Sequence, residues 1–149
     1  MDRYVSEAME LPLLEGRPDF SRADLVFEGV DHSGASFEAR IFIGNADADE
    51  TTPRDPAHGF AGAFTIFGHG GCAGDEGHCE VPEDQTDPED QRLPHPLTPA
   101  TKLVRITDAL KRLSQSEFSI TVVPVLPGRD GPRREDVLFF DSVELELYD

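Results

Sequence analysis

Basic residues are scarce in this chain of 149 residues, which has 13 Lys and Arg against 30 Asp and Glu and a formal net charge of -17 at pH 7. A molecule with such an excess of negative charge repels the phosphate backbone of nucleic acids and the anionic headgroups of lipids. We therefore expect neither nucleic acid nor a membrane surface among its partners.

Long apolar runs are also absent. No segment approaches the roughly 20 apolar residues that a membrane-spanning helix needs. The residues from Met1 to Glu7 contain no basic segment followed by an apolar one, which a secretory signal would have. We therefore expect a cytoplasmic protein, or one that is exported together with a partner.

Cysteine is limited to Cys72 and Cys79. Two cysteines permit one disulfide within the chain, and an intracellular setting favours free thiols instead. The hydrophobic fraction of 38%, with ten Phe, is sufficient for an ordered core.

The length of the chain predicts a single domain. Pro12, Gly16 and Pro18 interrupt the first segment and prevent any long helix or strand there, so we expect residues 1–23 to form an N-terminal arm. Residues 24–149 are expected to form one β-sandwich domain with a long loop over residues 68–99. The second half of that loop is rich in Pro, Asp and Glu and cannot supply a core.

Alternation of apolar and polar residues predicts β-strands. It is clearest over residues 37–43, where Phe37, Ala39, Ile41 and Ile43 would share one face. The other expected strands cover residues 24–30, 60–67, 101–107, 118–126 and 137–148.

Three details accompany these strands. The last one is expected to bend near Asp141, and Pro124 implies an edge position or a bulge. Thr107 is expected to cap a short helix that extends to Leu113. Together these patterns predict an all-β fold, an antiparallel β-sandwich of jelly-roll or Greek-key type with one short helix and long acidic loops.

The segment after Phe67 holds the candidate functional residues. An apolar run ends there and is followed by glycines, which let the backbone turn tightly. The candidate metal ligands are His69, Cys72, His78 and Cys79. Two imidazoles and two thiolates suit copper(I) or tetrahedral zinc, although the spacing is not that of a standard zinc finger. The sequence therefore predicts a copper site, with zinc as the alternative.

Two other interpretations of the same residues stay open. Cys72 and Cys79 can form a disulfide that closes a small loop. Alternatively, either cysteine can act as a nucleophile activated by His69 or His78, because a neighbouring imidazole stabilises the thiolate.

Several stretches of the chain resemble a known family. They are Phe-Glu-Ala-Arg-Ile-Phe at 37–42, the acidic run at 45–54, Gly-Phe-Ala-Gly-Ala-Phe at 59–64 and Phe-Gly-His-Gly at 67–70. From about Asp24 to the C-terminus the chain is similar to the β-rich C-terminal domain of tyrosinases, polyphenol oxidases and related type 3 copper proteins. In that family a separate helical domain binds the copper pair through six histidines, and the β-domain covers or supports the entrance to the active site.

The resemblance implies a free-standing accessory domain rather than a complete oxidase. This chain has five histidines and no helical pair of them, so it lacks the six-histidine dicopper core. The implied partner is a helical type 3 copper oxidase domain, which the β-domain would dock on, shield or supply with copper. Two alternatives remain: a small metal- or cysteine-dependent enzyme that uses the same loop, and a structural subunit with a Cys72–Cys79 disulfide.

Overall fold

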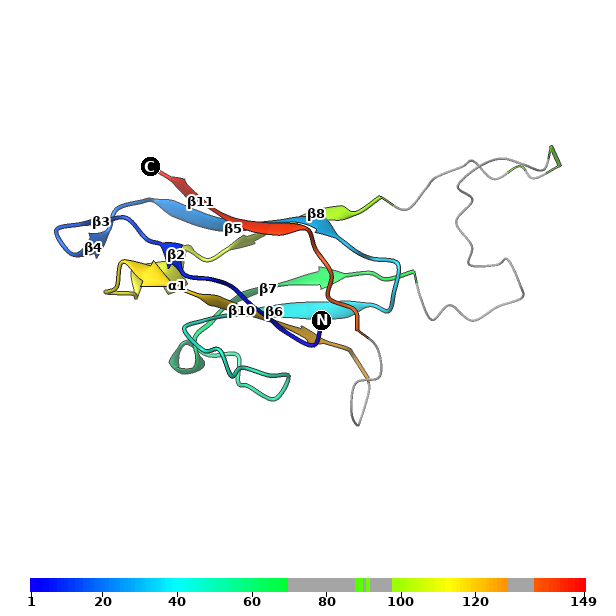
Figure 1. Ribbon diagram of the computed structural model, residues 1–149, viewed down its shortest axis with the longest axis horizontal. Helices are drawn as coiled ribbons and strands as arrows, with labels where there is room; N and C mark the ends of the chain where they lie inside the picture. The colour runs from blue at the N-terminus through cyan, green and yellow to red at the C-terminus, as the bar shows by residue number, and fades with distance from the viewer. Residues whose placement is uncertain (70–87, 90, 92–97, 129–135) are drawn as a thin grey trace.

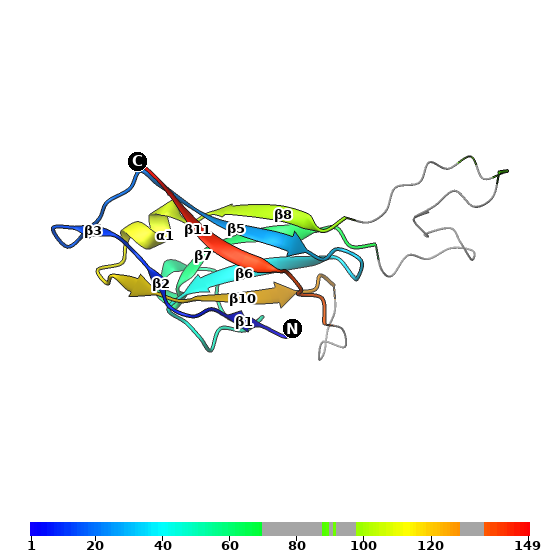
Figure 2. The ribbon, with the colours of Figure 1, turned by 45° about the horizontal axis from the view of Figure 1, so that its top comes forward.

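The computed structural model describes residues 1–69, 88–89, 91, 98–128 and 136–149. Two antiparallel sheets pack face to face (Figures 1 and 2). One has the order β1 (Tyr4–Val5), β10 (Ile120–Val125), β6 (Phe37–Ile43) and β7 (Phe60–Ile66), and the other has the order β11 (Ser142–Tyr148), β5 (Arg22–Val30) and β8 (Ala100–Arg105). The predicted all-β sandwich is confirmed.

Short elements complete the fold. Two small ladders pair β2 (Met9–Glu10) with β9 (Glu117–Phe118), and β3 (Leu13–Leu14) with β4 (Arg17–Pro18). The helix α1 (Thr107–Lys111) follows β8, and a 3-10 turn, η1 (Pro56–His58), precedes β7. None of the helices in the described part of the chain has the length and apolar character needed to cross a bilayer.

Strand β6 shows why the apolar alternation produces a sandwich. Phe37, Ala39, Ile41 and Ile43 are buried against the second sheet, as the sequence predicts. Phe42 is also buried, but it belongs to a separate cluster with Ala48 and Val123. Ala48 comes from the connection between β6 and β7, so this connection contributes a buried side chain to the second cluster. Both faces of this sheet therefore carry apolar packing.

Phe27 of β5 lies at the centre of the core and has no exposed surface. Its ring centroid is 5.0 Å from that of Phe64 and 5.3 Å from that of Phe140. Since Phe64 belongs to β7, the contact joins the two sheets. Burial of one such side chain contributes about 1.5–3 kcal/mol.

Small residues on β7 allow the sheets to approach closely at one edge. A Cβ atom added to Gly62 would lie 2.7 Å from Cγ1 of Val104 in β8, which is closer than van der Waals contact. Glycine at position 62 thus allows a strand of the other sheet to pack directly over β7.

The N-terminal residues take part in the sheets. Tyr4 and Val5 pair with Val122 and Thr121 of β10, and Leu11 is buried. The predicted arm of residues 1–23 therefore contains four two-residue strands, β1 to β4, as well as the start of β5 at Arg22.

Several local predictions need correction. Thr107 does not cap α1 with its side chain: the N-cap is Ile106, and the Thr107 hydroxyl accepts a hydrogen bond from the Ala23 amide at 2.9 Å. The last strand begins only at Ser142, although Val137 and Leu138 before it are buried in the core.

Pro124 lies in a strand that β1 and β6 flank, so the predicted edge position is wrong for the strand as a whole. It holds for part of the strand, because β1 pairs only with Thr121 and Val122 and its pairing ends before Pro124. A proline is tolerated where the ladder needs no amide donor.

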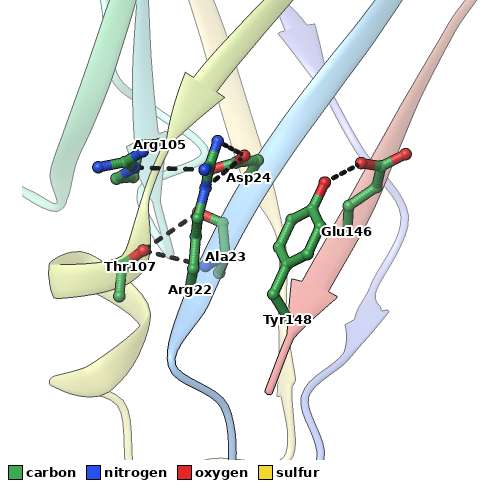
Figure 3. Close-up of polar contacts among 7 residues, drawn as sticks. All are labelled: Arg22, Ala23, Asp24, Arg105, Thr107, Glu146 and Tyr148. Atoms are coloured by element: carbon green, nitrogen blue, oxygen red, sulfur yellow. Dashed lines mark hydrogen bonds and ion pairs between the residues drawn. The ribbon is translucent and has the colours of Figure 1, made fainter.

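A polar cluster joins β5 to β8 and α1 (Figure 3). The buried Asp24 carboxylate accepts hydrogen bonds from Nε of Arg22 at 3.0 and 2.8 Å, and Nε of Arg105 lies 3.9 Å from it. The hydrogen bond to Asp24 raises the pKa of Arg22 above its ordinary value. Because a buried charge is tolerated only when it is paired, this cluster has a structural explanation.

Tyr148 extends the same cluster along β11. Its hydroxyl donates a hydrogen bond to Oε2 of Glu146 at 2.6 Å, which raises the pKa of Tyr148, and the guanidinium of Arg22 lies 5.3 Å from its ring centroid. Figure 3 shows these side chains on adjacent strands.

Candidate functional site

The predicted metal ligands lie only partly within the described structure. His69 is described and exposed, three residues after the end of β7. Cys72, His78 and Cys79 lie outside the described residues, so the four-ligand site, the disulfide and the cysteine nucleophile all stay predictions. In the described part of the chain, no group of three or more His, Cys, Asp or Glu residues is placed to hold a metal ion.

The structure brings His69 next to His32, a residue that the sequence did not single out. Their Nδ1 atoms are 3.2 Å apart, and their ring centroids are 5.0 Å apart with the planes at 58°. His32 follows β5 in the connection to β6, so the two histidines come from the ends of strands in opposite sheets. They meet just after the end of β7 and just before the start of β8. These two strand ends lie on the right in Figure 1.

Backbone contacts hold these two connections together. The His69 amide donates to the His32 carbonyl at 2.9 Å, and the Gly68 amide donates to Oγ of Ser36 at 3.0 Å. A Cβ atom at Gly68 would overlap the Gly34 carbonyl oxygen and lie 2.5 Å from the carbonyl carbon of Ala35. Only glycine permits this approach, so Gly68 has a packing reason to be glycine.

An apolar surface lies beside the histidine pair. Phe67 is 88% exposed, the largest exposed fraction among the large hydrophobic residues of the described chain. It lines a hollow of about 370 Å³ whose other walls are mostly strand residues. The lining residues are Ser36, Phe37, Glu38, Arg40, Thr65, Ile66, Phe67, Val125 and Pro127.

Charged groups rim this hollow. Glu38 accepts from Nε of Arg40 at 3.0 Å and from Nη1 of Arg54 at 3.3 Å. The hollow therefore combines an apolar wall with ion pairs at its rim. Protein–protein interfaces have the same arrangement, an apolar centre with a polar rim.

His58 lies at the opposite end of β7 from His69, beside Asp55. Its Nδ1 atom is 2.6 Å from Oδ1 of Asp55, and its amide donates to the same carboxylate. This hydrogen bonding lowers the pKa of Asp55. Asp55 is the N-cap of η1, so His58 has a local structural role beside a second hollow of about 420 Å³.

Comparisons with known proteins give a fold and no sequence family: no family model and no curated protein matches the chain. Among solved structures, latent aurone synthase, a polyphenol oxidase, matches with a TM-score of 0.52. The form from natural source is 17% identical over 98% of this chain, and a recombinantly expressed form is 18% identical over 99% of it. This chain has the fold of part of a polyphenol oxidase.

The match covers 24% of the aurone synthase chain, so this chain spans about a quarter of the length of those enzymes. That share is consistent with the C-terminal β-domain that the sequence resembles, and it confirms the resemblance for the fold.

Proposed function

We propose that this chain is an accessory β-domain that docks on the helical dicopper domain of a type 3 copper oxidase and shields its active site. Two observations support this. The fold is shared with a quarter of a polyphenol oxidase chain that is described as latent. The five histidines of the sequence are one fewer than the resemblance requires for a copper pair, so the copper chemistry would belong to the partner.

The exposed Phe67 is the observation on which the docking proposal rests. An aromatic side chain has only two side-chain torsions and loses little conformational freedom on binding, and aromatic residues are often energetic centres of interfaces. The adjacent hollow with its walls of strand residues adds apolar surface to the same face. We infer that Phe67 inserts into the mouth of the partner's active site.

The charge of the chain sets the character of the partner's surface. With a net charge of -17, the β-domain will associate fastest with a basic surface around that mouth. The association rate should therefore fall as ionic strength rises, while the contribution of Phe67 persists at high salt.

The test uses the type 3 copper oxidase encoded in the same genome, produced without any β-domain of its own. Binding is followed by biolayer interferometry, and the oxidation of a catechol by the partner is followed with and without the β-domain. The wild-type domain should bind and lower the activity. Phe67→Ala should weaken binding by roughly 10- to 100-fold, the equivalent of burying one Phe side chain.

Leu14→Ala is the matched control, because Leu14 is also exposed but lies on the β3–β4 hairpin at the far end of the molecule (Figure 1). It should bind like the wild type. A genome without such an oxidase, or equal affinities of the Phe67 and Leu14 variants, would refute the proposal.

Copper binding by His69, Cys72, His78 and Cys79, with zinc as the alternative metal, is a second part of the proposal. It is supported by the donor set and by the exposed position of His69 on a loop that backbone hydrogen bonds hold in place. In this version the domain carries copper to its partner. Tight copper(I) binding at this site should require the thiolates, and unchanged copper(I) affinity after Cys72 and Cys79 are both changed to Ser would reject it.

A further inference from the structure

We propose that His32 and His69 form a two-imidazole chelate for a divalent transition-metal ion. Their Nδ1 atoms are 3.2 Å apart. A metal ion bonded to both at the usual 2.0–2.1 Å would subtend an N–metal–N angle of roughly 100–106°, close to tetrahedral. The two nitrogens thus already have the separation that a chelate requires.

The surroundings of His32 leave a lone pair on Nδ1, the ring atom that faces His69. Its Nε2 atom lies 2.6 Å from the carbonyl oxygen of Thr98. A carbonyl only accepts, so Nε2 carries the proton, and in the neutral imidazole Nδ1 is left unprotonated. Metal-binding histidines are commonly oriented by such a hydrogen bond from the second ring nitrogen.

His69 holds the proton that the metal would replace. Its Nδ1 atom is 3.2 Å both from Nδ1 of His32 and from the His32 carbonyl oxygen, and both can accept a hydrogen bond from it. When the metal binds, this proton leaves Nδ1 and the imidazole is protonated on Nε2 instead. The imidazole keeps one proton, and no oxidation or reduction takes place.

The backbone preorganises the pair. The hydrogen bond from the His69 amide to the His32 carbonyl fixes the two chain segments against each other before any metal binds. Because these segments leave strands β5 and β7 of opposite sheets, the metal would link the two halves of the sandwich. A metal ion that binds only the folded protein would then raise its free energy of unfolding.

The donor set determines the class of ion. Imidazole nitrogen suits Zn²⁺, Ni²⁺ and Cu²⁺, with Cu²⁺ bound most tightly. Within the described residues, the side-chain ligands that converge here are those of His32 and His69. This site goes beyond the proposed function: it does not depend on docking, and it uses neither cysteine.

The experiment is a calorimetric titration with Zn²⁺ on the full chain carrying Cys72→Ser and Cys79→Ser, which removes the thiolates. We expect one Zn²⁺ per chain and a higher melting temperature with the metal. His32→Gln and His69→Gln should each weaken binding at least tenfold. His58→Gln is the matched control, because His58 is already hydrogen bonded to Asp55 at the other end of β7, and it should bind normally.

Nitrogen-15 NMR of the imidazoles gives a readout that does not rely on substitutions. Without metal, His32 should be protonated on Nε2 and His69 on Nδ1. With Zn²⁺, both Nδ1 resonances should shift, and His69 should be protonated on Nε2. Unshifted Nδ1 resonances, or equal losses of affinity for the His32 and His58 variants, would overturn the chelate. Phe67→Ala should leave Zn²⁺ binding unchanged, so failure of the docking proposal is distinguishable from failure of this one.

Discussion

Replacement of Gly68 by Ala tests whether the close packing of Gly68 against residues 34–35 is what brings His32 and His69 together. The added Cβ atom would lie 2.5 Å from the Ala35 carbonyl carbon and would also overlap the Gly34 carbonyl oxygen. Carbon atoms prefer separations of about 3.5–4.0 Å, so the segments must move apart by at least about 1 Å. The neighbours are backbone atoms, which cannot rotate away as a side chain can.

The size of this displacement decides the outcome. An increase of about 1 Å in the 3.2 Å separation of the two Nδ1 atoms brings it to about 4.2 Å. Two metal–nitrogen bonds of about 2.1 Å then meet only on a straight line, which tetrahedral coordination does not permit. Gly68→Ala should therefore lose Zn²⁺ binding although both histidines are present.

The assay is the same Zn²⁺ titration on the chain without thiolates, with circular dichroism to confirm that the β-sandwich has folded. Gly34→Ala is the matched control, because a Cβ atom there meets only Cγ1 of Val137 at 4.0 Å, an ordinary contact. Wild-type affinity in a folded Gly68→Ala variant would refute the reasoning, as would equal losses in the two variants.

Two predictions concern stability and are tested by urea denaturation. Phe27→Ala removes the ring that contacts both Phe64 and Phe140, and it should lower the free energy of unfolding by about 3–5 kcal/mol; a loss below about 1 kcal/mol would show that the core closes around the gap. Thr121→Val should raise the free energy of unfolding by about 1 kcal/mol, because the buried Thr121 hydroxyl has no hydrogen-bond partner among the described residues and valine has nearly the same shape. A destabilised Thr121→Val variant would indicate a partner outside those residues.

The strands were predictable because their signal is local. Alternation over 37–43 specifies which side chains of β6 face the second sheet, and the structure confirms those faces. The start of β11 was not predictable in this way. Val137 and Leu138 are apolar and buried, although they lie outside any strand. An apolar pair in the sequence predicts burial, but it does not distinguish a strand from an irregular segment packed on the core.

The histidine pair was only half predictable. His69 follows an apolar strand and precedes glycines, which makes it conspicuous. His32 lies in an ordinary turn, Asp31-His32-Ser33-Gly34, and nothing in that turn indicates a partner 37 residues later. The pairing depends on which strand ends lie together in the sandwich, and alternation carries no information about that. Thr107 gives the same lesson: its hydroxyl bonds to a distant strand rather than to its own helix.

The contact between Gly62 and Val104 leaves no space for a ligand between the two sheets at that position. At that position the two layers are so close that a single additional methyl group has no room, so the long side formed by β7 and β8 is sealed there. Molecules that approach this side meet only its outer surface. New binding specificities would therefore arise on the outer faces of the sheets and on the connections at the ends of the sandwich, where a larger side chain does not force the two sheets apart.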